Sequence, residues 1–374
     1  ASSSGNVDKA IENYLTLIER FPADNAGLNN LAVSYFLKRR FDKALEYSDQ
    51  LLEIFPNRPL YRGNHALYLM YSGQFEAAAQ EGQETLELDP SYHVAWLPIA
   101  VAAVRNGDYA AAASAYGSMA DASADAGDIA RLAAADLALY RGLPAAAAAQ
   151  LREGLARGGT VSEQGDFARR MAAWQAVADV DRGAAFDVEQ LLTATGERRQ
   201  PALLVPAAWA LVGADAHEAA ESLAQRLAQQ PAPESRAYGS VIRGWIALAT
   251  DTPLAAIDHG REALRLADLW LVRDLLGRAY LAAGSPVEAM SEFDVCAERL
   301  GEGIAAFLDD LPTLRLTQEL EYWRAQARQG AGLTDEARRG YAAFVAQFAP
   351  DAEHPLLRLA QTQLDEAGTD LQQD

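Results

Sequence analysis

A period of 34 residues runs through the N-terminal part of the chain and constrains its fold more than any other feature. Three residue classes keep this interval: proline at Pro22, Pro56 and Pro90, alanine at Ala10, Ala44, Ala78 and Ala112, and an aromatic ring at Phe41, Phe75 and Tyr109. Such self-similarity is typical of solenoids, in which each copy is one supersecondary unit stacked on the next. We therefore expect a serial array, although 374 residues would also allow two or three globular domains.

Each copy has the pattern of two amphipathic helices joined by a short turn. The eighth position of successive copies is small, at Ala32, Ala66 and Ala100, where the first helix must approach the second closely. Gly73 and Gly107 end first helices, since a left-handed cap position favours glycine. β-Branched residues are sparse and apolar alternation is absent, so no strand is predicted.

This pattern resembles the tetratricopeptide (TPR) repeat. The resemblance implies an all-α, TPR-type α-solenoid: a right-handed superhelix of about nine helical hairpins, some degenerate. We divide the chain into the second helix of a truncated repeat (1–22), a regular TPR array (23–123), degenerate helical repeats (124–234), a TPR-like array (235–349) with an insertion at 301–317, and a C-terminal capping helix and tail (350–374). The missing first helix of 1–22 suggests a fragment of a longer protein. In the insertion, Gly301, Gly303 and Pro312 predict a loop with a short helix, and we interpret Gly301-Glu302-Gly303 as a helix terminator.

Charge and composition exclude several classes of partner. The formal net charge is −20, so nucleic acid or an anionic membrane would meet a repulsive field. The longest apolar runs are too short to span a bilayer, and no signal segment begins the sequence. A single cysteine, Cys296, excludes an intramolecular disulfide and a cysteine cage for a metal. These features favour a cytoplasmic protein, while a periplasmic or extracytoplasmic sensor stays open.

The sequence offers no constellation for catalysis. No two of the five histidines lie at helical metal-ligand spacing, no H-E-x-x-H occurs, and protein-kinase catalytic motifs are absent. Cys296 lies at a small position of the repeat, where a side chain packs rather than reacts. We predict no enzyme activity for this chain, no cofactor and no metal.

The inner positions of the first helices are the candidate binding site, for a protein or peptide. The early copies place mostly apolar residues there: Asn29, Val33, Phe36, Leu67, Met70, Tyr71, Leu97 and Val101. These residues either pack against neighbouring helices or line an apolar groove for a partner helix or an extended segment. Farther along, the inner positions mix aromatic and charged residues: Asp136, Tyr140, Trp245, Asp274, Arg278 and Tyr322. Aromatic and arginine anchors suit protein recognition.

Three segments give a further resemblance: 307–341, 60–70 and 109–140. They are similar to the TPR region that follows the kinase domain in some bacterial eukaryote-like Ser/Thr protein kinases. The resemblance implies a non-catalytic scaffold or sensor region that recruits partners to an attached enzyme. The alternative is an array that binds a small molecule or signalling peptide and controls an attached effector domain.

Overall fold

The structure is a computed structural model, and it describes residues 4–122, 126–157, 162–309 and 311–370. Within these ranges the elements of secondary structure are all helices. No β-strand occurs in these ranges. The prediction of an all-α, TPR-type array of hairpins is confirmed. The chain divides into two compact units, one formed by Ala1–Ala133 with Leu300–Pro312 and the other by Ala134–Arg299 with Thr313–Asp374.

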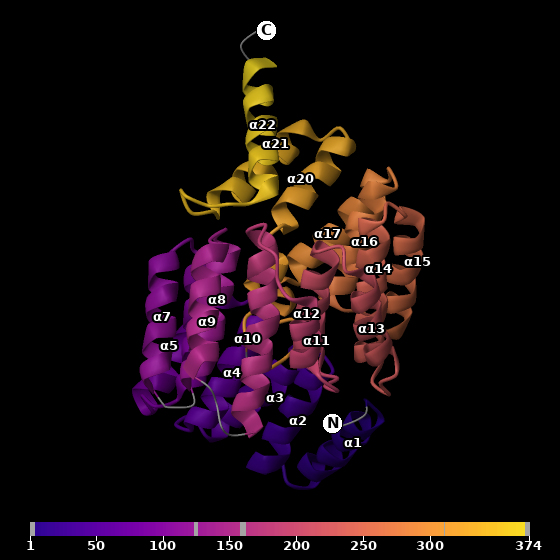
Figure 1. The fold of residues 1–374 in the computed structure, drawn as a ribbon. Helices are drawn as coiled ribbons and strands as arrows, with labels where there is room; N and C mark the ends of the chain where they lie inside the picture. The colour runs from indigo at the N-terminus through magenta and orange to yellow at the C-terminus, as the bar shows by residue number, and fades with distance from the viewer. Residues whose placement is uncertain (1–3, 123–125, 158–161, 310, 371–374) are drawn as a thin grey trace. The chain divides into compact units, whose positions relative to one another are not determined.

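The first unit stacks hairpins along the first 133 residues (Figure 1, indigo to violet). Each helix packs against the next one in the chain, from α1 to α7. The helices are α1 (Ser4–Arg20), α2 (Asn25–Leu37), α3 (Phe41–Ile54), α4 (Pro59–Tyr71), α5 (Phe75–Leu88), the short 3₁₀ turn η1 (His93–Ala95), α6 (Trp96–Arg105), α7 (Tyr109–Ala122) and, from far along the sequence, α18 (Leu300–Ile304). The unit boundary falls within α8 (Ala126–Tyr140).

The second unit continues the same arrangement. Helices α13 to α16 stand side by side in Figure 1, and each packs on the next. The helices are α9 (Pro144–Arg157), α10 (Ser162–Asp181), α11 (Val188–Thr195), α12 (Pro201–Gly213), α13 (His217–Ala228), α14 (Pro233–Ala249), α15 (Pro253–Leu266), α16 (Trp270–Ala282), α17 (Pro286–Glu298), α19 (Leu314–Thr317), α20 (Leu320–Gly330), α21 (Thr334–Ala346) and α22 (Pro355–Asp370). Residues 371–374 of the predicted tail lie outside the described ranges.

The turn inside each hairpin has one residue in the left-handed conformation. Nine described residues take this position after a first helix: Arg39, Gly73, Gly107, Gly142, Gly183, Asp215, Asp251, Gly284 and Gly332. Six are glycine, for which positive φ has no steric cost. The segments 163–196 and 201–230, which match the repeat poorly in sequence, therefore still form the hairpins α10–α11 and α12–α13.

The alanines of the 34-residue period form the contacts inside the hairpins. Ala32, Ala66 and Ala100 on first helices are at most 1% exposed, and the second-helix alanines Ala44, Ala78 and Ala112 are fully buried. A larger side chain at these positions would force two helices apart. The spacing of small residues in the sequence thus sets which helix faces meet.

The insertion at 301–317 is buried, unlike most connecting segments, which run over the surface. Residues 301–306 and 311–320 are all buried. Gly301, Glu302 and Gly303 lie within α18, so their interpretation as a helix terminator is wrong. Glycine serves a close backbone approach at Gly301 rather than the end of a helix.

Candidate functional site

The predicted groove residues of the first unit are mostly covered. Asn29 and Val33 on α2 are half-buried, and the Asn29 side chain accepts a hydrogen bond from the amide of Asn64 at 3.2 Å. The other six are less than 9% exposed: Phe36, Leu67, Met70, Tyr71, Leu97 and Val101. Neighbouring rings account for part of this burial, since Phe36 lies 4.8 Å from the Tyr71 ring and 5.2 Å from the Tyr68 ring, centroid to centroid.

Helix α18 covers the C-terminal end of α4 in this unit. A Cβ atom added to Gly301 would lie 2.5 Å from the carbonyl oxygens of both Met70 and Tyr71. Only a residue without a side chain allows the two backbones to approach so closely. The chain's own segment therefore lies against two of the residues that we predicted to bind a partner.

Arg39 joins the same segment to α2. Its guanidinium group lies 3.4 Å from a Glu302 carboxylate oxygen and donates to the carbonyl oxygen of Ala306 at 3.1 Å. The side chains of Arg39 and Glu302 are only 14% and 5% exposed, so this ion pair is largely shielded from water. From the sequence alone, only the helix dipole accounts for the Lys38-Arg39-Arg40 cluster. The acidic partner of Arg39 could not be recognised there, because it lies more than 260 residues away.

In the second unit, Arg278 is held between two tryptophans and two acids. Its guanidinium carbon lies 5.8 Å from the Trp209 ring centroid and 5.2 Å from that of Trp323. The guanidinium donates to Asp274 at 2.8 Å and to Glu319 at 2.7 Å. Burial raises the pKa of Asp274, although the charge of Arg278 opposes this. The site therefore combines cation–π contacts with buried ion pairs.

Glu319 and Arg315 come from the insertion and its end. Arg315 donates to Asp181 of α10 at 2.7 and 2.9 Å, and it lies 3.6 Å from Glu319. His354 approaches the same Glu319 carboxylate at 3.4 Å. Burial would raise the pKa of Glu319, but Arg278, His354 and Arg315 together hold this pKa well below its ordinary value.

Asp136 binds the backbone at the start of α19. Its two carboxylate oxygens accept from the backbone amides of Leu314 at 2.7 Å and Arg315 at 3.1 Å. Burial raises the pKa of Asp136 to about 7, against the lowering effect of these hydrogen bonds. Beside it, the Gln318 side-chain amide donates to the carbonyl oxygens of Leu139 and Tyr140, both at 2.9 Å.

The remaining predicted residues separate into two environments. Trp245 is buried and its ring lies 4.9 Å from that of Trp209, so it joins the environment of Arg278. Tyr322 instead belongs to a hydrophobic cluster with Tyr341 and Phe344, and is 4% exposed. Tyr140 is buried, and its contact with the insertion is made by its backbone.

Sequence reasoning missed four residues that complete this second site: Trp209, Arg315, Glu319 and Trp323. A signal for two of them exists, since Arg315 and Glu319 are spaced i, i+4 in an otherwise uncharged stretch. Within the described ranges, no cluster of His, Cys, Asp or Glu could hold a metal ion. In those ranges, too, every helix is too short or too polar to cross a membrane.

Comparison with known proteins agrees with the repeat pattern. Solved structures of low similarity include a tetratricopeptide repeat protein from Parabacteroides merdae ATCC 43184 (15% identity, 74% of this chain and 93% of the other, TM-score 0.41). They also include the human IFIT1 dimer with m7Gppp-AAAA (14% identity, 97% of this chain and 77% of the other, TM-score 0.45). Yeast Tom70 is a third (12% identity, 95% of this chain and 97% of the other, TM-score 0.32). No curated protein matches this chain significantly. Residues 1–59 and 64–128 match the family model of the tetratricopeptide repeat, so this part of the chain carries tetratricopeptide repeats.

Proposed function

We propose that this chain is a non-catalytic scaffold or sensor region that binds a protein or peptide on the inner faces of its hairpins. In this proposal it belongs to a larger bacterial signalling protein, such as a Ser/Thr protein kinase. TPR arrays are suited to this role because their repeats expose a long concave surface to a partner.

The observation that supports the proposal is that residues at or next to the predicted inner positions hold a segment of the chain itself. In the first unit, α18 and the residues after it meet α2 and α4 through a close backbone approach, a shielded ion pair and a hydrogen bond to a main-chain carbonyl. Peptide recognition by other proteins uses the same kinds of contact. A surface that binds one segment in this way is chemically able to bind another.

The part of α2 that stays accessible gives the partner a place to bind. Asn29 and Val33 are half-buried and Leu37 is 43% exposed, all on the inner positions of α2. In this proposal the partner contacts these residues and extends along the face that segment 300–309 occupies. The partner either replaces that segment or binds alongside it.

Site-specific photo-crosslinking tests the proposal. A photoreactive phenylalanine analogue is placed at Leu37 in the full-length protein, expressed in cells that naturally contain it, and matched with the same analogue at Gln50, an exposed position of α3. We expect a discrete adduct from Leu37 that is absent from Gln50 and that a Val33→Glu substitution removes. Equal adducts at both positions, or no adduct at Leu37, would contradict inner-face binding.

A further inference from the structure

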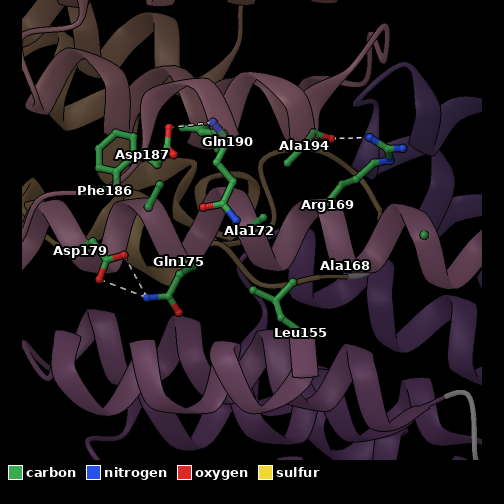
Figure 2. Close-up of a pocket in the computed structure, with 13 residues that line it drawn as sticks. Leu155, Ala168, Arg169, Ala172, Gln175, Asp179, Phe186, Asp187, Gln190 and Ala194 are labelled. Carbon is green, nitrogen blue, oxygen red and sulfur yellow. Dashed lines mark hydrogen bonds between the residues drawn. The ribbon is translucent and has the colours of Figure 1, made fainter. Parts of the chain in front are cut away.

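A cavity of about 500 Å³ lies beside α10 and α11, in the least regular hairpin of the chain (Figure 2). The hairpin is irregular because its second helix is short. Helix α11 has 8 residues, whereas the second helices of the other described hairpins have 12 to 14. Only part of α10 is therefore covered, and a space stays open between the two helices. Its volume is within the range of small-ligand sites.

The walls of this cavity are apolar in the middle. Leu155 of α9, Ala168 and Ala172 of α10, and Phe186 and Leu191 line it. The small alanine side chains leave room above α10 for a narrow ligand. The middle of the cavity therefore suits a short chain with small apolar groups.

One end carries a cation that lacks an acidic partner. Arg169 extends from α10 to the C-terminal end of α11, where its Nη1 donates to the carbonyl oxygen of Ala194 (Figure 2). Among the described residues no carboxylate forms an ion pair with Arg169. Its remaining N–H groups are free to bind an anionic group, and a guanidinium group matches a carboxylate in geometry.

The other end carries an anion. Asp187 caps α11 by accepting a hydrogen bond from the backbone amide of Gln190 at 3.0 Å. No cation among the described residues pairs with it. Asp179, the other acid of the cavity, differs because Arg182 neutralises it at 2.7 Å. One carboxylate with spare acceptor capacity therefore lies opposite Arg169.

The length of α11 sets the distance between Asp187 and Ala194, the residue whose carbonyl oxygen Arg169 contacts. Asp187 precedes α11 and Ala194 lies near its end, so seven residues at 1.5 Å each separate the two ends by about 10 Å. Three residues of extended peptide span about the same length, at roughly 3.3 Å per residue. The length of α11 between these two residues thus matches the length of a tripeptide.

Two amide side chains lie along this path. The Gln190 side chain points from α11 into the space above Ala172 in Figure 2, and no hydrogen bond to it is found among the described residues. Gln175 donates to Asp179 at 3.2 Å, but its own buried carbonyl oxygen accepts no hydrogen bond within the described ranges. An unpaired buried acceptor is costly, and a peptide N–H would satisfy it.

We propose that this cavity binds an elongated zwitterion of tripeptide length. Its ammonium group meets Asp187, its carboxylate meets Arg169, and its peptide groups meet Gln175 and Gln190. The site is independent of inner-face binding, and the failure of either proposal leaves the other standing.

Calorimetry with trialanine as the probe tests the site. N-acetyl-trialanine and trialanine amide each lack one terminal charge, and dialanine and pentaalanine change the distance between the charges. We expect trialanine to bind, and every other peptide to bind about tenfold more weakly or worse. A blocked peptide loses the charge-assisted hydrogen bond at its blocked end, and a peptide of another length cannot form both hydrogen bonds at once. Because these ligands differ and the protein does not, the comparison is free of folding effects.

Variants then assign each end. Asp187→Asn removes the charge but keeps the helix cap, because asparagine caps as well as aspartate. It should weaken trialanine about tenfold and leave N-acetyl-trialanine unchanged. Arg169→Gln should weaken trialanine similarly and leave trialanine amide unchanged. Glu189→Gln and Arg199→Gln, exposed charges nearby that do not line the cavity, serve as matched controls and should bind as the wild type.

Three results would overturn the proposal. The first is no binding of trialanine by the wild type up to about 10 mM. The second is equal affinity for trialanine and its blocked forms. The third is a loss of affinity in Glu189→Gln or Arg199→Gln as large as that in Asp187→Asn or Arg169→Gln.

Discussion

Substitution of Gly301 by alanine tests how closely the insertion lies against α4. The new Cβ atom would lie 2.5 Å from the carbonyl oxygens of Met70 and Tyr71 and 2.7 Å from the amide nitrogen of Gly73. Ordinary van der Waals contact begins near 3.4 Å, so α18 would have to move by about 0.9 Å. The atoms that it meets are backbone, which cannot rotate away as the end of a side chain can.

The magnitude follows from two opposing effects. Overpacking of this kind costs roughly 1–3 kcal/mol. Alanine gains up to about 1 kcal/mol over glycine in a helix, although a helix as short as α18 realises only part of this. We expect Gly301→Ala to lower the free energy of unfolding by about 1–2 kcal/mol, measured by urea denaturation with circular dichroism.

Gly117→Ala is the matched control. Gly117 lies within α7, and a Cβ added there meets no atom within 4 Å. The same substitution should therefore raise the free energy of unfolding by about 0.5–1 kcal/mol. If Gly301→Ala is neutral, or stabilises as Gly117→Ala does, the close approach of α18 to α4 is absent and the reasoning is refuted.

Three further predictions concern single residues. The folded pKa of Asp136 is about 7, above its ordinary 3.8, so its contribution to stability is present below about pH 4 and lost as pH rises through 7. Between pH 4 and 7 the free energy of unfolding of the wild type, measured by urea titration, should fall relative to that of Asp136→Asn by up to about 1.4 kcal/mol per pH unit. Parallel pH profiles of the two proteins would refute this. Burial raises the pKa of the fully buried Cys296 thiol well above its ordinary value, so Ellman's reagent should label it only after unfolding; rapid native labelling would contradict its burial. Asp251 has a φ of 54°, so Asp251→Gly should raise the free energy of unfolding by about 0.5–1 kcal/mol and with it the melting temperature. An unchanged melting temperature would count against the left-handed turn.

The hairpins could be predicted because their determinants are local. Ala32 and Ala44 mark the faces on which two helices meet, and Gly73 marks a turn, each through the size of one side chain. Arg39 and Asp251 take the same left-handed turn without glycine, so the sequence alone gives no sign of them. The hairpins of the described ranges therefore follow from the repeat even where individual copies depart from it.

The segment that covers several of the predicted groove residues could not be predicted, because its contacts are far apart in sequence. Asp136 binds the backbone of Leu314 across 178 residues, and Arg39 reaches Glu302 across 263. A repeat pattern shows which positions face inward but does not show what covers them. The short α11 and its cavity were missed for a related reason, since the helix lies in a copy that barely matches the repeat.

Hydrogen exchange of the insertion, followed by mass spectrometry on the whole chain, tests most directly whether the inner faces hold this segment. The backbone amides of Leu314 and Arg315 donate to the buried Asp136, and α18 lies against α4. We expect peptides covering 300–309 and 313–319 to exchange as slowly as those from α4 and α16. Exchange at the rate of an unstructured chain would show that the insertion is not held by Asp136 and α4, contrary to this structure.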